Sequence, residues 1–518
     1  MKKFSFCLFV LTAFILLVSC GGVGGGGGGG AAGGSADDGP SGGSAVGATY
    51  APAYIYNVPE EFQTSSYTIY TIRRSYDGRS LNLSSTNTYA QVANSDFGSE
   101  QQFNGKSFVQ NTDEWPVPEA GFITRNRFWG VQSENYVENV TEKDFWFLSN
   151  FANDISVHET FKLKKIGTHC RVWYRKSEDE SSGSLTDNQL ETIKDKLDAM
   201  FAVETALCGS METTRNWSNI ISIPSGSKLE IVVYSMGENY LGYFHPRDFN
   251  ITDAKSNKAP IIYISSTDTT SNMYSTVSHE LNHLLNYIKK TVNNNLHIET
   301  WYTELLSNTI EEVLENFNGV SADDSVRKDH LPVFLCSYNR GLFWNQDFQS
   351  YSNVFAFGAW LLRNYGGASL FQKIATNNLV QEASIEKAVR DMGYNETFDS
   401  LRLKFAESLI FTEYNCGKPN FNKRIYDTGF FSGVTIDMPE INLMSITSIS
   451  SASADNAAAL VNCSAGASYK GPLILKPDYH FQQILPYGFE LNKLGTGDNV
   501  QQIQIPSEAF GRTSVEFK

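Results

Sequence analysis

The stretch His279-Glu280-Leu281-Asn282-His283 lies in the middle third of a 518-residue chain and is its most informative sequence. On an α-helix, residues four positions apart lie on the same face one turn apart. His279 and His283 can therefore present their imidazole nitrogens to one ion. Glu280 lies beside them, where its carboxylate would meet a water molecule at the metal rather than the metal itself. This spacing predicts a zinc site carried by a helix.

The residues around this stretch favour a helix. Neither a proline nor a charged residue lies in 273–278 or 284–288. The positions that form an apolar stripe at helical spacing are Met273, Val277, Leu281, Leu284 and Ile288. Ser275, His279 and His283 fall on another face of the same helix. The alternative is an ordinary amphipathic helix that carries two partly exposed histidines.

A catalytic zinc ion normally has three protein ligands and one open position for water. Glu304 is the leading candidate for the third ligand. It lies in a second predicted helix that begins near Glu299, and a loop over 291–296 would let the two helices run antiparallel. Three other carboxylates compete for this role, and each of the four could instead be a solvated helix residue. They are Glu299, Glu311 and Glu312.

An HExxH motif followed about twenty residues later by a glutamate ligand resembles the gluzincin metallopeptidases. The hyicolysin family of bacterial metallopeptidases is the closer match, because its second motif has the form Trp-Leu-Asn-Glu-Gly. Here that motif is Trp301-Tyr302-Thr303-Glu304-Leu305, with Thr303 in place of Asn and Leu305 in place of Gly. The similarity extends over roughly 160–410 and leaves the two ends of the chain outside it. The two replacements concern contacts to substrate rather than the metal ligands.

The resemblance implies a zinc-dependent peptidase that acts on proteins or peptides. Zinc would polarise the scissile carbonyl, and Glu280 would accept the proton of the attacking water and pass it to the leaving amine. Tyr351 is the first candidate to stabilise the oxyanion, although packing could equally explain any one of the 25 tyrosines. Met236-Gly237-Glu238-Asn239 contains the residues of an aminopeptidase motif in the wrong order, which favours an endopeptidase.

The order of predicted elements indicates an α+β fold. We expect a β-rich N-terminal domain over 49–158, a gluzincin-like metallopeptidase domain with a helical C-terminal subdomain over 159–425, and a β-rich C-terminal region over 426–518. Thr186 and Gln189 have the form of a capping box that opens a helix. The other expected elements are strands at 67–72, 145–148, 170–174, 229–234 and 260–265 and helices at 351–365, 384–392 and 398–411.

The first twenty residues carry a targeting signal. Lys2 and Lys3 precede an apolar stretch over 8–18 that is short for a membrane span, as in a signal peptide. It ends in Leu17-Val18-Ser19-Cys20, which resembles a bacterial lipobox with Cys20 as the lipidated (palmitoylated) residue. A Gly-rich tether follows over 21–48. We therefore expect a lipid-anchored protein of the bacterial cell envelope that faces the periplasm or the cell surface.

Charge and composition restrict the partners. A formal net charge of −15 disfavours nucleic acid, because binding to a phosphate backbone requires Lys and Arg to displace counterions. The sequence also lacks a P-loop and a Gly-rich dinucleotide turn. An alternative to the peptidase is a catalytically silent surface lipoprotein, an adhesin or a scaffold, on a metallopeptidase fold. A zinc hydrolase that acts on a non-peptide bond is a third possibility.

Overall fold

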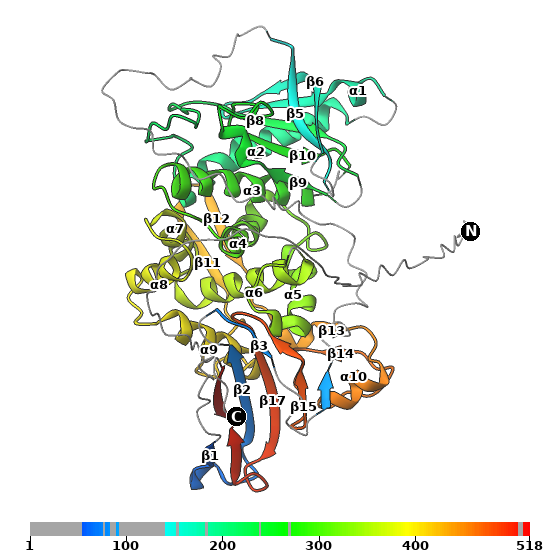
Figure 1. The fold of residues 1–518 in the computed structure, drawn as a ribbon, viewed down its shortest axis with the longest axis vertical. Coiled ribbons are helices and arrows are strands. Elements are labelled where there is room, and N and C mark those ends of the chain that lie inside the picture. The colour runs from blue at the N-terminus through cyan, green and yellow to red at the C-terminus, as the bar shows by residue number, and fades with distance from the viewer. Residues whose placement is uncertain are drawn as a thin grey trace, which may run out of the picture. The chain divides into compact units, whose positions relative to one another are not determined.

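A computed structural model of the chain is shown in Figure 1. It describes residues 54–75, 78–82, 90–92, 140–151, 155–181, 185–237, 240–267, 271–345, 347–505 and 511–518. Cys20 and the Gly-rich tether lie outside these residues, as do Glu238 and Asn239. The described part has a mixed α/β structure, which confirms the sequence prediction at that level.

The largest sheet has six strands in the order β5-β6-β7-β8-β10-β9. Their bounds are Glu142–Asn150 (β5), Ile155–Ile166 (β6), Cys170–Arg175 (β7), Leu229–Tyr234 (β8), Gly242–Phe244 (β9) and Ile261–Ser265 (β10). Strands β7, β8 and β10 run parallel, and β9 joins β10 antiparallel at one edge. Every residue of β8, β9 and β10 is buried, as expected for strands that are covered on both faces.

The helix with the HExxH stretch packs against this sheet. α3 (Asn272–Asn286) lies between β9 and β10 on one side and α4 (Thr300–Asn318) on the other (Figure 1). The π-helical turn η3 (Tyr287–Val292) extends α3 before the chain turns back into α4. Next to α3 lies α2 (Asp187–Cys208), and its N-terminus has the predicted capping box between Thr186 and Gln189.

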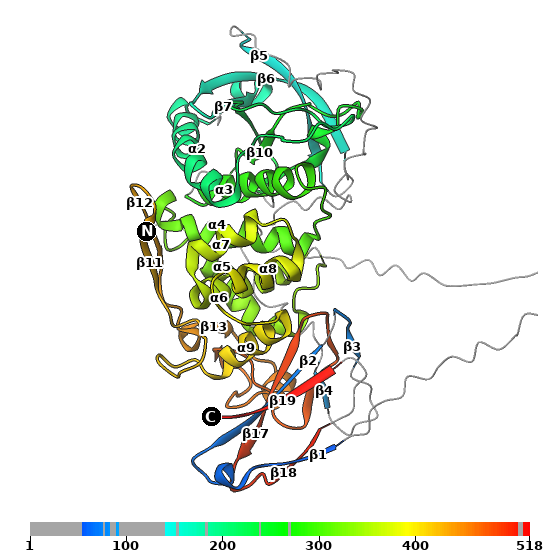
Figure 2. The ribbon, with the colours of Figure 1, turned by 90° about the vertical axis from the view of Figure 1, so that its left-hand side faces the viewer.

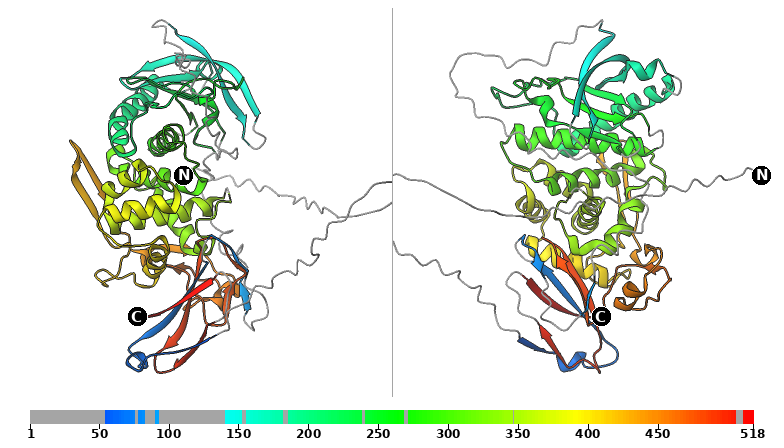
Figure 3. Two further views of the ribbon diagram at one scale, coloured as in Figure 1. Left: turned by 60° about the vertical axis from the view of Figure 1, so that its left-hand side comes forward. Right: turned by 45° about the vertical axis from the view of Figure 1, so that its right-hand side comes forward.

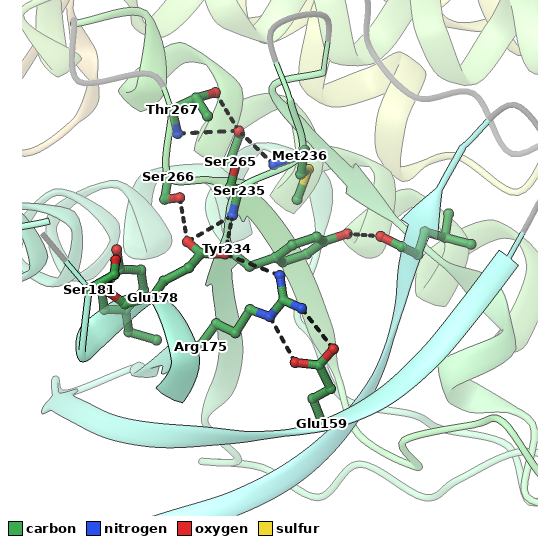
Figure 4. Close-up of polar contacts among 12 residues, drawn as sticks. Glu159, Arg175, Glu178, Ser181, Tyr234, Ser235, Met236, Ser265, Ser266 and Thr267 are labelled. Carbon is green, nitrogen blue, oxygen red and sulfur yellow. Dashed lines mark hydrogen bonds and ion pairs between the residues drawn. The ribbon is translucent and has the colours of Figure 1, made fainter. Parts of the chain in front are cut away.

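A partly buried carboxylate connects the loops at one end of the parallel strands. Glu178 of α1 (Lys176–Asp179) accepts hydrogen bonds from the backbone N–H of Ser235 at 2.8 and 3.0 Å. It also accepts one from the Ser266 hydroxyl at 2.8 Å (Figure 4). Ser235 follows β8 and Ser266 follows β10, so one side chain fixes both strand ends. The second of these loops leads into α3, which carries the candidate site.

The helices after α4 form the next layer. They are α5 (Val326–Ser337), α6 (Phe348–Tyr365), α7 (Gly367–Thr376), α8 (Gln381–Asp391) and α9 (Phe398–Ile410). The sequence predicted α6, α8 and α9 to within a few residues at each end. α6 approaches α4 closely at Gly358, where an added Cβ would lie 2.0 Å from the Thr309 hydroxyl oxygen. The hairpin β11 (Ile425–Phe431) and β12 (Val434–Met438) runs beside α4 and α7 (Figure 2).

Strands from the two ends of the described chain pair with each other. β2 (Thr68–Ser75) lies between β17 (Phe489–Thr496) and β19 (Gly511–Phe517), antiparallel to both (Figure 3). Three more pairs join the same regions: β1 (Tyr54–Asn57) with β18 (Gln502–Ile505), β3 (Leu81–Asn82) with β16 (Gln483–Ile484), and β4 (Ala90–Val92) with β15 (Tyr479–Phe481). The strands of the region 49–158 thus belong to five sheets: β1 to β4 each pair with C-terminal strands, whereas β5 and the start of β6 belong to the six-stranded sheet.

The remaining elements are short. They are η1 (Glu60–Phe62), η2 (Pro246–Phe249), η4 (Tyr338–Arg340), η5 (Leu443–Ser445), β13 (Thr447–Ile449), β14 (Tyr469–Lys470) and α10 (Ala454–Ala459). The cysteines of the described residues are all unpaired thiols: Cys170, Cys208, Cys336, Cys416 and Cys463. None of the helices in the described ranges combines the length and the apolar character that a bilayer span requires.

Candidate metal centre

Three buried side chains converge from α3 and α4. His279 and His283 lie one turn apart on α3, and Glu304 lies in the second turn of α4. The Nε2 atoms of the two histidines are 3.0 Å apart. The Glu304 carboxylate oxygens lie 3.4 Å from Nε2 of His279 and 3.5 Å from Nε2 of His283. Within the described residues, these three form a group that could hold a metal ion.

The distances between these atoms suit a small tetrahedral ion. Zinc binds imidazole nitrogen and carboxylate oxygen at about 2.0–2.1 Å, and a tetrahedron of that size separates its ligand atoms by about 3.3–3.4 Å. The three observed separations bracket this value. Calcium fits poorly, because it takes six to eight oxygen ligands at longer distances. Two imidazoles and one carboxylate favour a transition metal or zinc and leave one tetrahedral position for a reactant.

The outer nitrogen of each histidine has its own partner. Nδ1 of His279 lies 2.7 Å from the Glu311 carboxylate, which also accepts a hydrogen bond from the Ser275 hydroxyl at 2.6 Å. Nδ1 of His283 lies 3.0 Å from the Thr303 hydroxyl. These contacts orient both rings so that Nε2 faces the centre, as partners of metal-ligating histidines usually do. Thr303, a departure from the hyicolysin motif, thus supports a ligand.

The cluster carries an excess of negative charge. Burial raises the pKa of Glu304, but the two histidines outweigh this effect and lower it to about 2. Burial lowers the pKa of His279, yet hydrogen bonds to Glu304 and Glu311 raise it to about 10. When no metal ion is bound, protons such as the one on His279 therefore offset the negative charge of these carboxylates. A bound dication would replace the protons, so metal binding would release them.

The Glu280 carboxylate interacts electrostatically with His279, Glu304 and Glu311. It is 2% exposed, and its carboxylate accepts a hydrogen bond from the backbone of Phe244 in β9. Burial, together with the charges of Glu304 and Glu311, raises its pKa to about 8. A bound dication would lower that pKa towards the range of a general base. Gly242 makes room for this residue, since a Cβ there would lie 3.1 Å from the Glu280 Cγ.

Tyr351, the sequence candidate for the oxyanion, lies in the first turns of α6 and is buried. Its ring contacts Trp344 edge to face at 4.8 Å between centroids. Burial raises its pKa well above the usual value, and the charges of Glu304 and Glu280 add to this. The phenol is therefore within electrostatic range of the centre and stays protonated, as a hydrogen-bond donor must.

His330 of α5 is a residue that the sequence did not single out. It is buried, and burial together with His279 lowers its pKa to about 3, so the ring is neutral. Its Nδ1 lies 3.1 Å from the hydroxyl of Ser352, the residue after Tyr351. A lone histidine has no spacing partner in the sequence, so no local pattern could have identified it.

The three rival carboxylates have other roles. Glu311 contacts the outer nitrogen of His279, as described above. Glu312 forms ion pairs with Arg327 and Arg363 at 3.0 and 2.5 Å. Glu299 precedes α4 and accepts a hydrogen bond from the Trp301 indole at 2.7 Å. No rival thus joins the group formed by the histidines and Glu304.

Comparison with known proteins does not assign this chain to a family. No family model matches the sequence, and no curated protein is similar to it. The geometry of the centre therefore carries the functional argument.

Proposed function

We propose that this protein is a zinc-dependent peptidase, and more specifically an endopeptidase of the hyicolysin type with a gluzincin-like fold. The observation that carries the proposal is the convergence of His279, His283 and Glu304 at tetrahedral spacing, with the buried Glu280 carboxylate in electrostatic interaction with His279 and Glu304. This combination of two imidazoles, a ligand carboxylate and a separate acid is what metal-assisted hydrolysis requires.

Zinc, when bound, would act as a Lewis acid on the scissile carbonyl and make a neighbouring water more acidic. Glu280 then takes the proton of the attacking water and gives it to the leaving amine. The hydrogen bond from the Phe244 backbone holds the carboxylate in place for both transfers. Its burial excludes bulk water, which strengthens every charge interaction at the centre.

The oxyanion that forms from the scissile carbonyl would need hydrogen-bond donors, which the three metal ligands do not supply. Tyr351 has a protonated hydroxyl within electrostatic range of Glu280 and Glu304, so it is the first candidate. His330 is the second candidate, because its contact with the Ser352 hydroxyl orients a neutral imidazole next to the same turn of α6. Preorganised donors of this kind typically contribute about 10²–10³-fold in rate.

The edge strand β9 favours a peptide as the substrate. Its residues pair with β10 on one side, and the Leu241 carbonyl accepts the Ser265 N–H at 2.7 Å. In an antiparallel pair, alternate residues direct their peptide groups away from the partner strand. Gly242 and Phe244 therefore face the outer edge, where the Phe244 backbone already reaches Glu280. A substrate in extended conformation can add to such an edge by main-chain hydrogen bonds.

The proposed location is the bacterial cell envelope. The lipobox ending at Cys20 and the Gly-rich stretch after it support a lipid anchor with a flexible tether. Substrates would then be proteins or peptides outside the cytoplasm, and the −15 net charge disfavours nucleic acid.

The test uses the purified full-length protein in mild detergent with an unfolded protein substrate such as reduced casein. We expect cleavage that a zinc chelator abolishes and that stoichiometric zinc restores. Glu280→Gln is the matched control, because it keeps size and ligands but removes the proton acceptor. It should bind one zinc per chain and lose about 10²–10⁴-fold in activity.

Two outcomes would contradict the proposal. A zinc-loaded wild-type protein that cleaves no substrate in a broad peptide library would favour the silent adhesin or scaffold. A Glu280→Gln protein that cleaves at nearly the wild-type rate would exclude the proposed mechanism.

A further inference from the structure

A polar side chain is fully buried where three helices meet. Asn282 of α3 is one of the two residues that separate Glu280 from His283. Its Nδ2 donates a hydrogen bond to the Cys208 sulfur of α2 at 3.1 Å. Its Oδ1 accepts a hydrogen bond from the Ser307 hydroxyl of α4 at 3.2 Å. One amide therefore connects α3 to both of these neighbouring helices.

The groups around this amide are neutral. The Asn286 amide donates to the same Oδ1 at 2.6 Å, so both lone pairs of that oxygen are used. Burial raises the pKa of Cys208 well above its ordinary value, and the sulfur therefore remains an uncharged thiol. Amides, hydroxyls and a thiol of this kind do not change their charge near neutral pH. The contacts of Asn282 are thus independent of protons and of a metal ion.

Other polar contacts between α3 and α4 belong to the metal centre itself. Glu311 contacts Nδ1 of His279, and Thr303 contacts Nδ1 of His283. Each of these contacts includes a metal ligand, so it changes when the imidazole gains a proton or a metal ion. The contact of Asn282 with α4 includes no ligand. It can hold the two helices together whatever the state of the centre.

The position of this contact matters for the third ligand. Ser307 lies one turn after Glu304, and Asn282 directly precedes His283. A shift of α4 by one residue would move Glu304 by about 1.5 Å along the helix axis and turn it by about 100°. A metal site tolerates deviations of only about 0.2 Å in its ligand distances. A hydrogen bond resists such a shift, because its strength depends on both distance and angle.

We propose that Asn282 is a positioning residue of the metal centre. Through Ser307 it fixes the register of α4 against α3, and it thereby places the Glu304 carboxylate at the Nε2 atoms of both histidines. The bond to Cys208 orients the amide from the side of α2. A single buried asparagine sets the register of helices in coiled coils by the same principle. The inference rests on the metal centre of the proposed function, but not on the reaction that the centre catalyses.

The test measures cobalt(II) binding by the full-length protein after removal of other metals. Competition with a chelator gives the affinity, and the visible absorption of the bound ion reports its coordination geometry. Ser307→Ala leaves Asn282 its other two hydrogen bonds, so folding should change little. This variant should nevertheless weaken cobalt binding several-fold and alter the absorption spectrum. Asn282→Leu should weaken binding by at least about 10-fold.

Thr309→Val is the matched control on the same helix. It removes a buried hydroxyl whose hydrogen bond, to the Leu305 carbonyl at 2.5 Å, lies within α4. Urea unfolding should show similar stability for Thr309→Val and Ser307→Ala, while only Ser307→Ala changes the cobalt site. In the double variant of Asn282→Leu and Ser307→Ala the losses of affinity should not add, because both changes remove one contact.

Three results would overturn the inference. An unchanged cobalt affinity and spectrum in Ser307→Ala would do so, even if Asn282→Leu does not fold. An equal change in Thr309→Val would show that any lost hydroxyl on α4 has this effect. A wild-type protein that binds no cobalt would overturn the metal centre as well, whereas a protein that binds cobalt without cleaving peptides would contradict only the peptidase proposal.

Discussion

Two groups of buried charge lie on the same helix, α4, and they are balanced in opposite ways. At Glu312 the carboxylate meets two guanidinium groups, those of Arg327 and Arg363. Within the described residues, Glu311, the preceding residue, and Glu304, about two turns earlier, form ion pairs only with histidines. An arginine is always charged, so the Glu312 group is complete without any further ion. Imidazoles supply no lasting charge, so the other group needs protons or a metal cation.

This difference distinguishes a buried carboxylate that stabilises the fold from one that can bind a metal ion. A buried carboxylate with a permanent cation is part of the scaffold, and its removal should affect folding. A buried carboxylate with titratable partners is a site for an external cation, and its removal should affect metal binding. The following predictions test this distinction in order of decreasing effect.

The largest effect should follow removal of a ligand. His279→Ala, His283→Ala and Glu304→Ala should each reduce bound metal from one ion per chain towards none, measured by elemental analysis after gel filtration. Glu299→Ala is the control, because that carboxylate contacts the Trp301 indole instead. If Glu304→Ala keeps its metal while Glu311→Ala loses it, Glu304 is not the third ligand.

Replacing Glu312 should have the opposite effect: it should lower stability and leave metal binding unchanged. Glu312→Gln leaves Arg363, which is buried without contact to solvent, short of its counter-charge. Breaking a buried pair in this way typically costs about 3–5 kcal/mol in free energy of unfolding. Urea unfolding would measure the loss, and any folded protein should still bind one metal ion. A Glu312→Gln protein that folds normally but lacks metal would contradict this distinction between folding and metal-binding carboxylates.

An intermediate effect is expected where a carboxylate supports a ligand without binding metal. Glu311→Gln weakens the contact to Nδ1 of His279, so metal affinity should fall by about 10–100-fold while folding is retained. Competition with a chromophoric chelator would measure this. Ser275→Ala, which removes only the hydrogen bond to Glu311, should weaken binding less. The reverse order would show that Glu311 does not act through His279.

The smallest effect concerns a carboxylate pair that is partly open to solvent. Burial and the nearby charge of Glu516 raise the pKa of Glu407 to about 7. A raised folded pKa means that the stability from this group is present below about pH 4.5 and is lost as pH rises through about 7. Glu407→Gln should therefore reduce the fall in Tm between pH 5 and pH 8. Lys418 contacts both acids and lessens the effect, and an unchanged pH profile would contradict it.

Some of the site could be predicted because its geometry is local. The pair His279 and His283 depends only on a helix and a spacing of four, and the helix was predictable from its apolar stripe. The capping box at Thr186 was predictable for the same reason. Thr303 and His330 were not, since their roles depend on contacts between separate helices rather than on a local repeat.

What the sequence determined by itself was the two histidines, the adjacent Glu280 and the existence of a second helix rich in carboxylates. Only the tertiary structure decided which carboxylate faces the histidines. Glu304, Glu311 and Glu312 lie on one helix, and the packing of α4 against its neighbours gives each a different contact. Glu304 lies at Nε2 of both histidines, Glu311 lies at Nδ1 of His279, and Glu312 pairs with Arg327 and Arg363. The pairing of β2 with β17 and β19 could not be predicted from the sequence either. Contacts between residues far apart in the chain are set by the packing of whole elements, which no local periodicity records.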